Sequence, residues 1–218
     1  MRIICSVIAL SLCAAASHAE APAEQPAEKG FVSLFNGKSL DGWQGSTKGY
    51  QVKDGVMICK PGGNIYTART YDDFVFRFEF KLPPGGNNGV GIRTPLKGDP
   101  AYVGMEIQIL DNSAPRYKNL KPQQYHGSIY GVVAAKRGHL KPVGEWNSEE
   151  IRCEGPNVKV TLNGTVIVEA DISQPHEFMH KRGHPGLKNK EGYIGFLGHG
   201  SPVEFRNIRI RRLKGDGN

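Results

Sequence analysis

Short runs in which apolar and polar residues alternate, separated by turn dipeptides, restrict the fold of this chain more than any other feature. A phenylalanine stands at every second position between 74 and 80, which predicts a strand with one aromatic face. Two further stretches read as hairpins, because the dipeptides at their centres tolerate the positive φ angles of a two-residue turn. They are 50–59 around Asp54-Gly55 and 158–168 around Asn163-Gly164.

Strand patterns continue through most of the chain, and no long stretch carries a convincing helical period. The glycines and prolines fall between the strand segments, where turns belong. Many short strands without helices to connect them predict one all-β domain of two antiparallel sheets packed face to face. Further strands are expected near 88–94, 103–110, 128–134, 146–153, 192–197 and 203–212.

The N-terminal residues predict export. A small apolar run from 3 to 16 follows Met1-Arg2, and Ser17-His18-Ala19 matches a small-x-small cleavage site. We therefore expect three segments, and the apolar run is too short to span a membrane. They are a signal peptide over 1–19, a disordered spacer rich in Ala, Pro and Glu over 20–29, and a single β-sandwich domain over 30–214.

The expected location is periplasmic or secreted. Lipid attachment at Cys13 is the second alternative, because Leu12 stands where Gly, Ala or Ser is usual in a lipoprotein signal. Cys59 and Cys153 remain in the mature chain, and the sequence leaves open whether they pair or stay as free thiols. The oligomeric state is also left open.

The charge pattern argues against a nucleic-acid partner. The formal net charge is +7, yet the basic residues are scattered, and the run 209–214 alternates like the solvated face of a strand. Nucleic-acid binding requires a basic patch within a recognisable module, and the sequence contains none.

The stretch 105–111, MEIQILD, carries the most suggestive polar pattern. Met105, Ile107 and Ile109 alternate with Glu106 and Gln108, and Asp111 follows at the end. Such polar residues on a strand are most often simply solvated. Carboxylates and amides are also the groups that hydrogen-bond sugar hydroxyls, so the alternation also fits a row of ligand-binding groups.

Other candidates lie on neighbouring strands and loops. Arg93 ends a strand in which Gly89 and Gly91 leave one face bare, as a close ligand or a bulge would require. His199 lies between two glycines after the strand 193–197. The remaining candidates are His126 and Tyr130 around Gly127-Ser128-Ile129, Trp43 as a core anchor or sugar-stacking ring, and the weakly patterned His176, His180 and His184.

Several chemistries lack their usual sequence signals. The chain has no Gly-x-Ser-x-Gly elbow, phosphate-binding loop or dinucleotide fingerprint. No cofactor is therefore expected. The three histidines spaced by four residues have no Cys or carboxylate partners at fixed spacing, so no metal site is predicted either.

An ordered set of motifs resembles the 3-keto-disaccharide hydrolase family across nearly the whole mature chain. Asn36-Gly37 with Trp43, the stretch 108–111 and Phe205-Arg206-Asn207-Ile208 are its most specific parts. The motifs are FVSLFNGKSLDGW at 31–43, GGNNGVGIR at 85–93, MEIQILDN at 105–112, HGSIYG at 126–131, GEWN at 144–147, VTLNG at 160–164 and a C-terminal block at 184–213.

The resemblance implies a concanavalin A-like jelly-roll sandwich and cleavage of glycosides whose C3 hydroxyl has been oxidised to a ketone. A C3 ketone acidifies the C2 proton, so a base can remove it and the C1 leaving group departs by elimination. Water then adds to the enone. Such a site needs a base near C2, an acid near the glycosidic oxygen and a donor to the enolate oxygen.

The resemblance supplies the positions, and the chemistry suggests the role of each residue. Glu106 and His199 are expected to form the proton-transfer pair, and Arg93 to stabilise the enolate oxygen. The predicted carbohydrate-binding residues are Gln108, Asp111, His126, Tyr130 and Trp43. The family often has Gln-Asp before its His-Gly, where this chain has Leu197-Gly198. That departure removes an amide and a carboxylate beside His199.

Two rival functions remain. A carbohydrate-binding module of the same fold would use the same residues without catalysis, and the Leu197-Gly198 departure favours it modestly. A retaining glucanase would need two carboxylates about 5 Å apart. The residue two after Glu106 is Gln108, so the glucanase mechanism lacks its second acid.

Overall fold

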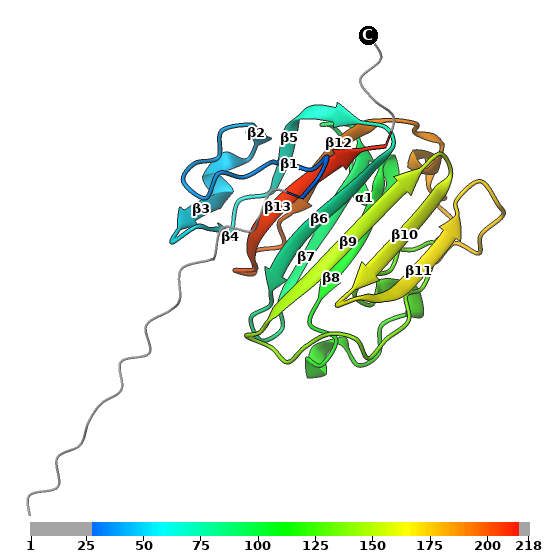
Figure 1. Ribbon diagram of the computed structural model, residues 1–218. Helices are drawn as coiled ribbons and strands as arrows, with labels where there is room; N and C mark the ends of the chain where they lie inside the picture. Colours follow the sequence, from blue (N-terminus) through cyan, green and yellow to red (C-terminus); the bar gives the residue numbers. More distant parts are fainter. Residues whose placement is uncertain (1–27, 214–218) are drawn as a thin grey trace, which may run out of the picture.

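Two antiparallel sheets packed face to face make up the fold (Figure 1). The computed structural model describes residues 28–213, so the predicted signal peptide and spacer residues 20–27 lie outside the described part. The fold is the expected all-β, concanavalin A-like jelly-roll sandwich. Within residues 28–213, no helix is long and apolar enough to cross a membrane.

The larger sheet has eight strands, in the order β11-β10-β9-β6-β13-β4-β3, with β1 paired to β13. Both predicted hairpins belong to it and turn at the predicted dipeptides. Its strands are β1 (Val32–Ser33), β3 (Tyr50–Lys53), β4 (Val56–Cys59), β6 (Phe74–Lys81), β9 (Trp146–Glu154), β10 (Asn157–Leu162), β11 (Thr165–Asp171) and β13 (Glu204–Arg212).

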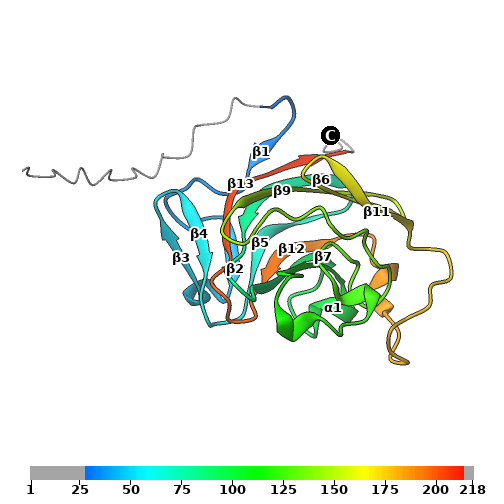
Figure 2. The same cartoon turned by 90° about the horizontal axis from the view of Figure 1, so that it is seen from below.

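The smaller sheet has five strands in the order β2-β5-β12-β7-β8. Figure 2 shows the two layers nearly edge-on, with α1 and several loops on the far side of the smaller sheet. Its strands are β2 (Trp43–Gly45), β5 (Asn64–Tyr71), β7 (Asn87–Thr94), β8 (Met105–Leu110) and β12 (Gly192–Leu197).

Within residues 28–213, helical structure is limited to single turns in loops. The short helix α1 (Pro100–Val103) begins at Asp99, whose carboxylate accepts a hydrogen bond from the amide of Ala101 at 3.3 Å. Four 3₁₀ turns complete the set: η1 (Thr47–Gly49), η2 (Pro115–Tyr117), η3 (Pro122–Gln124) and η4 (Pro185–Lys188).

Aromatic side chains fill the space between the sheets. The phenylalanines at every second position of β6 all point inward and are buried. Phe196 of the smaller sheet stacks on Phe205 of the larger sheet, with ring centroids 3.9 Å apart. Each buried phenylalanine contributes roughly 1.5–3 kcal/mol through the hydrophobic effect. Cys59 and Cys153 are buried free thiols, and burial raises the pKa of Cys153 to about 12.

The sequence patterns missed some strands and overstated another. β1, β2 and β5 were not predicted. Conversely, the strand expected at 128–134 contains only isolated bridges, from Ile129 to Ile107 and to Val133. Gly127 and Gly131 adopt positive φ angles on either side of Ile129, which breaks the extended backbone that a strand requires.

Candidate active site

The alternating residues of β8 separate cleanly between the two faces of the smaller sheet. Met105, Ile107 and Ile109 enter the core, whereas Glu106 and Gln108 point away from it. Glu106 and Gln108 are nevertheless each only 5% exposed. They are therefore not a solvated strand face, and loops on the outer side of the sheet shield them.

Glycines on β7 make room for these two side chains. Gly91 lies opposite Glu106, and Gly89 lies opposite Gln108. A Cβ atom on Gly89 would overlap the Glu106 carboxylate, so that carboxylate rests directly on bare backbone. Gly89 and Gly91 do leave one face of β7 without side chains, as the sequence indicated. What occupies it is a side chain of the protein.

Three side-chain oxygens on this outer face lack a hydrogen-bond partner within the described residues. They are Glu106 Oε1, Gln108 Oε1 and Asn87 Oδ1. Asn87 shares the face because it alternates with Gly89 and Gly91 along β7. Leaving a buried polar group without a partner costs about 1–3 kcal/mol, which a ligand supplying donors such as sugar hydroxyls would recover.

His199, in the loop after β12, faces the buried carboxylate of Glu106. Its Nε2 lies 3.8 Å from Glu106 Oε1, and its side chain is 49% exposed. The Glu106 carboxylate raises the pKa of His199, with a smaller contribution from Asp99 and against the opposing effect of burial. Exposed imidazole and buried carboxylate thus form a pair, as expected for a proton-transfer site.

An irregular segment extends the sheet beyond β8 and brings Tyr130 beside Glu106. The amide of Tyr130 donates to the Glu106 carbonyl at 2.8 Å, and the amide of Gln108 donates to the Ser128 carbonyl at 3.0 Å. Ile129 bridges Ile107 in the core, so Tyr130 points outward beside Glu106. The sequence prediction of Tyr130 near the site is supported by this geometry.

Tyr102 is a neighbour that the sequence analysis missed. Its ring stacks on the imidazole of His184, with centroids 4.6 Å apart, and the guanidinium of Arg182 lies 3.8 Å from the ring centroid. Burial raises the pKa of Tyr102, and the nearby Tyr130 and Glu106 add to the increase. No local signal could identify Tyr102 or Asn87, because long-range contacts bring them to β8.

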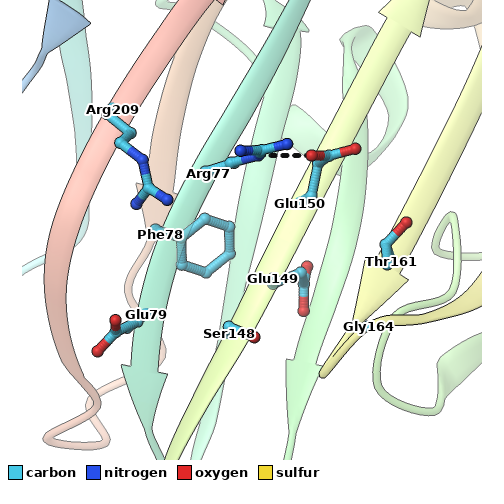
Figure 3. A pocket seen from close by; sticks show the side chains of 9 residues that line it. All are labelled: Arg77, Phe78, Glu79, Ser148, Glu149, Glu150, Thr161, Gly164 and Arg209. Carbon is cyan, nitrogen blue, oxygen red and sulfur yellow. Dashed lines mark hydrogen bonds and ion pairs between the residues drawn. The ribbon is translucent and has the colours of Figure 1, made fainter. Parts of the chain in front are cut away.

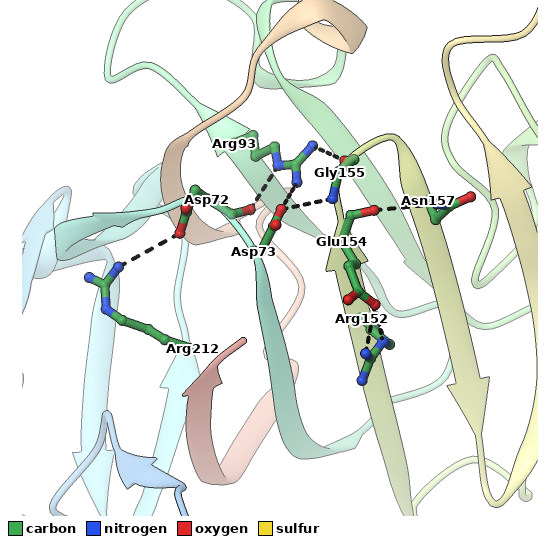
Figure 4. Close-up of polar contacts among 8 residues, drawn as sticks. All are labelled: Asp72, Asp73, Arg93, Arg152, Glu154, Gly155, Asn157 and Arg212. Atoms are coloured by element: carbon green, nitrogen blue, oxygen red, sulfur yellow. Dashed lines mark hydrogen bonds and ion pairs between the residues drawn. The ribbon is translucent and has the colours of Figure 1, made fainter. Parts of the chain in front are cut away.

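Arg93 does not join this cluster (Figure 4). Its guanidinium donates to Asp73 Oδ1 at 3.0 Å, to the Asp72 carbonyl at 3.0 Å and to the Gly155 carbonyl at 2.7 Å. With only 3% exposure, Arg93 links β7 to the connection between β5 and β6 and to the turn between β9 and β10. We therefore correct its predicted role: Arg93 is a structural residue, and its nitrogens are already occupied.

Three predicted sugar-binding residues also serve the structure. Trp43 stacks on Phe196 in the core and donates to the Leu34 carbonyl at 2.7 Å. The Asp111 carboxylate accepts hydrogen bonds from Gly85 and Ser113, which lower the pKa of Asp111 although burial opposes the shift.

His126 is the third of these residues. It lies in the core, where its Nε2 is 3.1 Å from Glu149 Oε2 and its ring packs on Phe80. Burial between the sheets removes it from the outer face. The predicted role of His126 in binding sugar is therefore corrected to an interior contact between the two sheets.

Leu197-Gly198, where the resemblance pattern has Gln-Asp, has a structural explanation. A Cβ atom on Gly198 would collide with the Gly63 carbonyl, so this backbone approach admits only glycine without a shift. The buried side chain of Leu197 lies over Gly91. The chain therefore replaces two polar groups beside His199 with close backbone packing and an apolar contact.

Two cavities lie elsewhere on the described part of the chain, and neither is lined by Glu106 or His199. One, of about 1130 Å³, includes Arg93, Phe178 and His184 in its wall. The other, of about 220 Å³, lies over the larger sheet between ion-paired side chains such as Arg77 and Glu150 (Figure 3). Among residues 28–213, no group of three His, Cys, Asp or Glu side chains could hold a metal ion.

Fold and site together define a jelly-roll sandwich with a buried carboxylate, a facing imidazole and unpartnered amide oxygens on one outer face. The same fold occurs in the carbohydrate-bound exoplasmic/lumenal domain of VIP36, with a TM-score of 0.51, 10% identity, and coverage of 87% of this chain and 90% of that one.

The chain belongs to the family of 3-keto-alpha-glucoside-1,2-lyase-like domains, whose model matches residues 30–211. It is 27% identical over 228 residues to a protein of Bacteroides thetaiotaomicron named 3-keto-disaccharide hydrolase, covering 84% of this chain and 79% of that protein. A crystal structure of a proposed glycosyl hydrolase from Parabacteroides distasonis superposes with a TM-score of 0.77 at 30% identity, covering 84% and 99% of the two chains.

Proposed function

We propose that this protein cleaves glycosides that carry a ketone at C3 of the sugar, by elimination across C1 and C2 followed by hydration. Family membership and the named Bacteroides relative support this substrate class. The observation that carries the proposal is the buried Glu106 carboxylate, which has one unpartnered oxygen and a facing imidazole.

Glu106 acts as the base in the first step. The C3 ketone acidifies the C2 proton, and the unpartnered Glu106 Oε1 takes it while the electrons move into the enolate. The Gln108 and Asn87 oxygens, which need donors, accept hydrogen bonds from sugar hydroxyls and hold the ring beside the Glu106 carboxylate.

His199 acts as the acid. When the enolate collapses and the C1–O bond breaks, the imidazolium gives its proton to the departing glycosidic oxygen. The products of this step are an alcohol and a 3-keto sugar with a C1–C2 double bond. By raising the pKa of His199, the Glu106 carboxylate keeps the imidazole protonated to a higher pH than a free histidine.

Hydration follows the elimination steps in reverse order, with water in place of the alcohol. Water adds to C1 and gives a proton to His199, while protonated Glu106 returns a proton to C2. The net reaction consumes one water, releases one alcohol and one 3-keto sugar, and restores both side chains. Such acid–base assistance commonly contributes about 10²–10⁴-fold to a rate.

A binding-only role is the second candidate, favoured by one specific observation. Leu197 and Gly198 stand where the resemblance pattern has Gln-Asp, so the rim beside His199 is less polar. The unpartnered oxygens of Gln108 and Asn87 would hold a sugar whether or not it is cleaved.

Incubation of the mature chain with a 3-keto disaccharide and with its unoxidised parent separates these functions. Release of a 3-keto monosaccharide from the oxidised compound alone is the expected result. Cleavage of both compounds would indicate an ordinary glycosidase. Binding of the 3-keto compound by calorimetry, without product, would establish the binding module instead.

We also propose that the protein is exported, on the basis of the N-terminal pattern at 1–19. Mass spectrometry of the protein from its native host should find a mature terminus near Glu20. A lipid-bearing N-terminus at Cys13 would support the alternative anchor and contradict cleavage after Ala19.

A further inference from the structure

Tyr130 occupies the position that the chemistry assigns to a donor for the enolate oxygen, and Arg93 leaves that role unfilled. The Ile107–Ile129 bridge and the hydrogen bond from the Tyr130 amide to the Glu106 carbonyl make Tyr130 and Glu106 cross-strand neighbours. Directly opposed side chains in an antiparallel pair have Cβ atoms about 5 Å apart. A sugar whose C2 proton meets Glu106 therefore has its C3 oxygen within reach of Tyr130.

Hydrogen bonds within the protein fix the direction of the Tyr130 hydroxyl. The amide of Lys121 donates to Gln124 Oε1 at 3.1 Å, so the opposite side of the Gln124 amide group is its Nε2 donor. That Nε2 lies 3.1 Å from Tyr130 Oη and donates to it. Because a tyrosine hydroxyl carries one proton, Tyr130 accepts from Gln124 and its own proton points elsewhere.

That proton has no described protein acceptor among residues 28–213, and Tyr130 is partly exposed. We propose that the Tyr130 hydroxyl donates a hydrogen bond to the C3 oxygen of the substrate, and that Gln124 is a positioning residue that holds this polarity. The role rests on the proposed function. As Glu106 removes the C2 proton, negative charge develops on the C3 oxygen, and the Tyr130 proton stabilises it without being transferred.

The polarity predicts a difference between two variants at position 124. In Gln124→Glu the carboxylate can only accept, so the Tyr130 proton turns toward it and away from the sugar. In Gln124→Ala the hydroxyl stays free to donate. Loss of one donor to a developing oxyanion costs about 10²–10³-fold, and we expect that loss in both Tyr130→Phe and Gln124→Glu. Gln124→Ala should lose about tenfold or less.

Exchange of the C2 proton with deuterium oxide measures the step directly. The probe is a 1,5-anhydro sugar with a ketone at C3, which forms the enolate but has no leaving group at C1. Proton NMR follows loss of the C2 signal in the full mature chain. Tyr117→Phe is the control, because Tyr117 is a partly buried tyrosine whose hydroxyl donates to the Gly85 carbonyl in another loop. Thermal melting verifies that each variant is folded.

The expected result is slow exchange in Tyr130→Phe and in Gln124→Glu, and wild-type exchange in Tyr117→Phe. Adding Gln124→Glu to Tyr130→Phe should cost little more, because both changes remove the same hydrogen bond. Wild-type exchange in Tyr130→Phe, or equal loss in Gln124→Ala and Gln124→Glu, would overturn the inference and leave the proposed function intact. Failure of the wild-type protein to catalyse exchange at all would overturn the elimination mechanism, and the inference with it.

Discussion

The outer faces of the two sheets both carry polar residues, but these residues are paired on the larger sheet and unpaired on the smaller sheet. On the larger sheet, charges pair across strands: Arg77 with Glu150, Arg206 with Glu79, and Lys81 with Glu204. On the smaller sheet, Glu106 and Gln108 are buried and each leaves an oxygen without a partner. Polarity alone does not mark a site. Buried side-chain oxygens without internal partners on an outer sheet face mark a candidate site, because a ligand bound there can complete their hydrogen bonds.

Two buried charged residues on the smaller sheet differ in whether their polar atoms have partners within the protein. Arg93 is as shielded as Glu106, yet its guanidinium is held by Asp73, Asp72 and Gly155. We therefore expect Arg93 to contribute to stability and Glu106 to contribute to turnover. Substitutions at the two positions should separate these properties.

The largest expected effect is on stability. Arg93→Met removes the buried guanidinium that links Asp73 and the Gly155 turn, and should lower the free energy of unfolding by about 3–5 kcal/mol. Urea denaturation measures it. The matched control is Arg77→Met on the larger sheet, where a partly exposed ion pair contributes about 1 kcal/mol or less. Equal losses at both positions would show that burial of Arg93 has no energetic consequence.

Glu106→Gln should have the opposite profile. Loss of the base lowers turnover of a 3-keto glycoside by roughly a hundredfold or more, while the folded state is retained. Steady-state kinetics measures the turnover, and thermal melting measures whether the folded state is retained. Glu150→Gln is the control on the other face, since that carboxylate is paired with Arg77 and faces solvent. A comparable loss of turnover in Glu150→Gln would contradict the assignment of the active site to the outer face of the smaller sheet.

Gln108→Met should stabilise the protein and weaken binding. Methionine matches the shape of glutamine but removes the buried Oε1 that has no partner, so the free energy of unfolding should rise by about 1 kcal/mol. The apparent affinity for the 3-keto sugar should fall by about tenfold for the lost hydrogen bond. Chemical denaturation and calorimetry make the two measurements. A destabilised Gln108→Met variant would mean that the amide is satisfied in solution.

The smallest expected effect is a shift in the titration of His199. The Glu106 carboxylate raises the pKa of His199, so Glu106→Gln should lower that pKa toward the ordinary value of a histidine. In the wild-type protein, the imidazolium persists to higher pH and is lost as the pH rises through the raised pKa. Turnover should decline over the same range. Histidine NMR titration checks this. An unchanged pKa of His199 in Glu106→Gln would show that the Glu106 carboxylate does not act on His199.

The sequence anticipated much of the fold because local patterns determine it. The aromatic alternation of β6, the two hairpin turns and the alternation of β8 each depend on neighbouring residues alone. Strand β5 was missed although it lies between β2 and β12. Its partners are distant in the sequence, and sheet membership depends on them.

The site was anticipated only in part, for reasons visible at single residues. Arg93 has φ 47°, at an irregularity in the pairing of β7 with β12, so simple alternation misplaced its side chain. His126 was predicted to bind sugar, but it lies in the core beside Glu149 of the other sheet. Glu106 and Gln108 share one face, as predicted, because the regular pairing of β8 with β7 fixes the direction of their side chains.

Removal of the C2 proton at Glu106 is the central claim, and a C2-deuterated 3-keto glycoside tests it most directly. The reaction is run in ordinary water, and the released 3-keto sugar is trapped at once by reduction, with a control for spontaneous exchange. Elimination transfers the deuterium from C2 to Glu106, so it predicts slower cleavage of the deuterated glycoside than of the undeuterated one, and loss of deuterium from C2 wherever the Glu106 carboxyl exchanges with water before it returns a proton. Glu106→Gln should stop cleavage and exchange together. A released sugar that keeps all of its deuterium at C2 and forms at the same rate as from the undeuterated glycoside would contradict elimination and indicate direct displacement at C1.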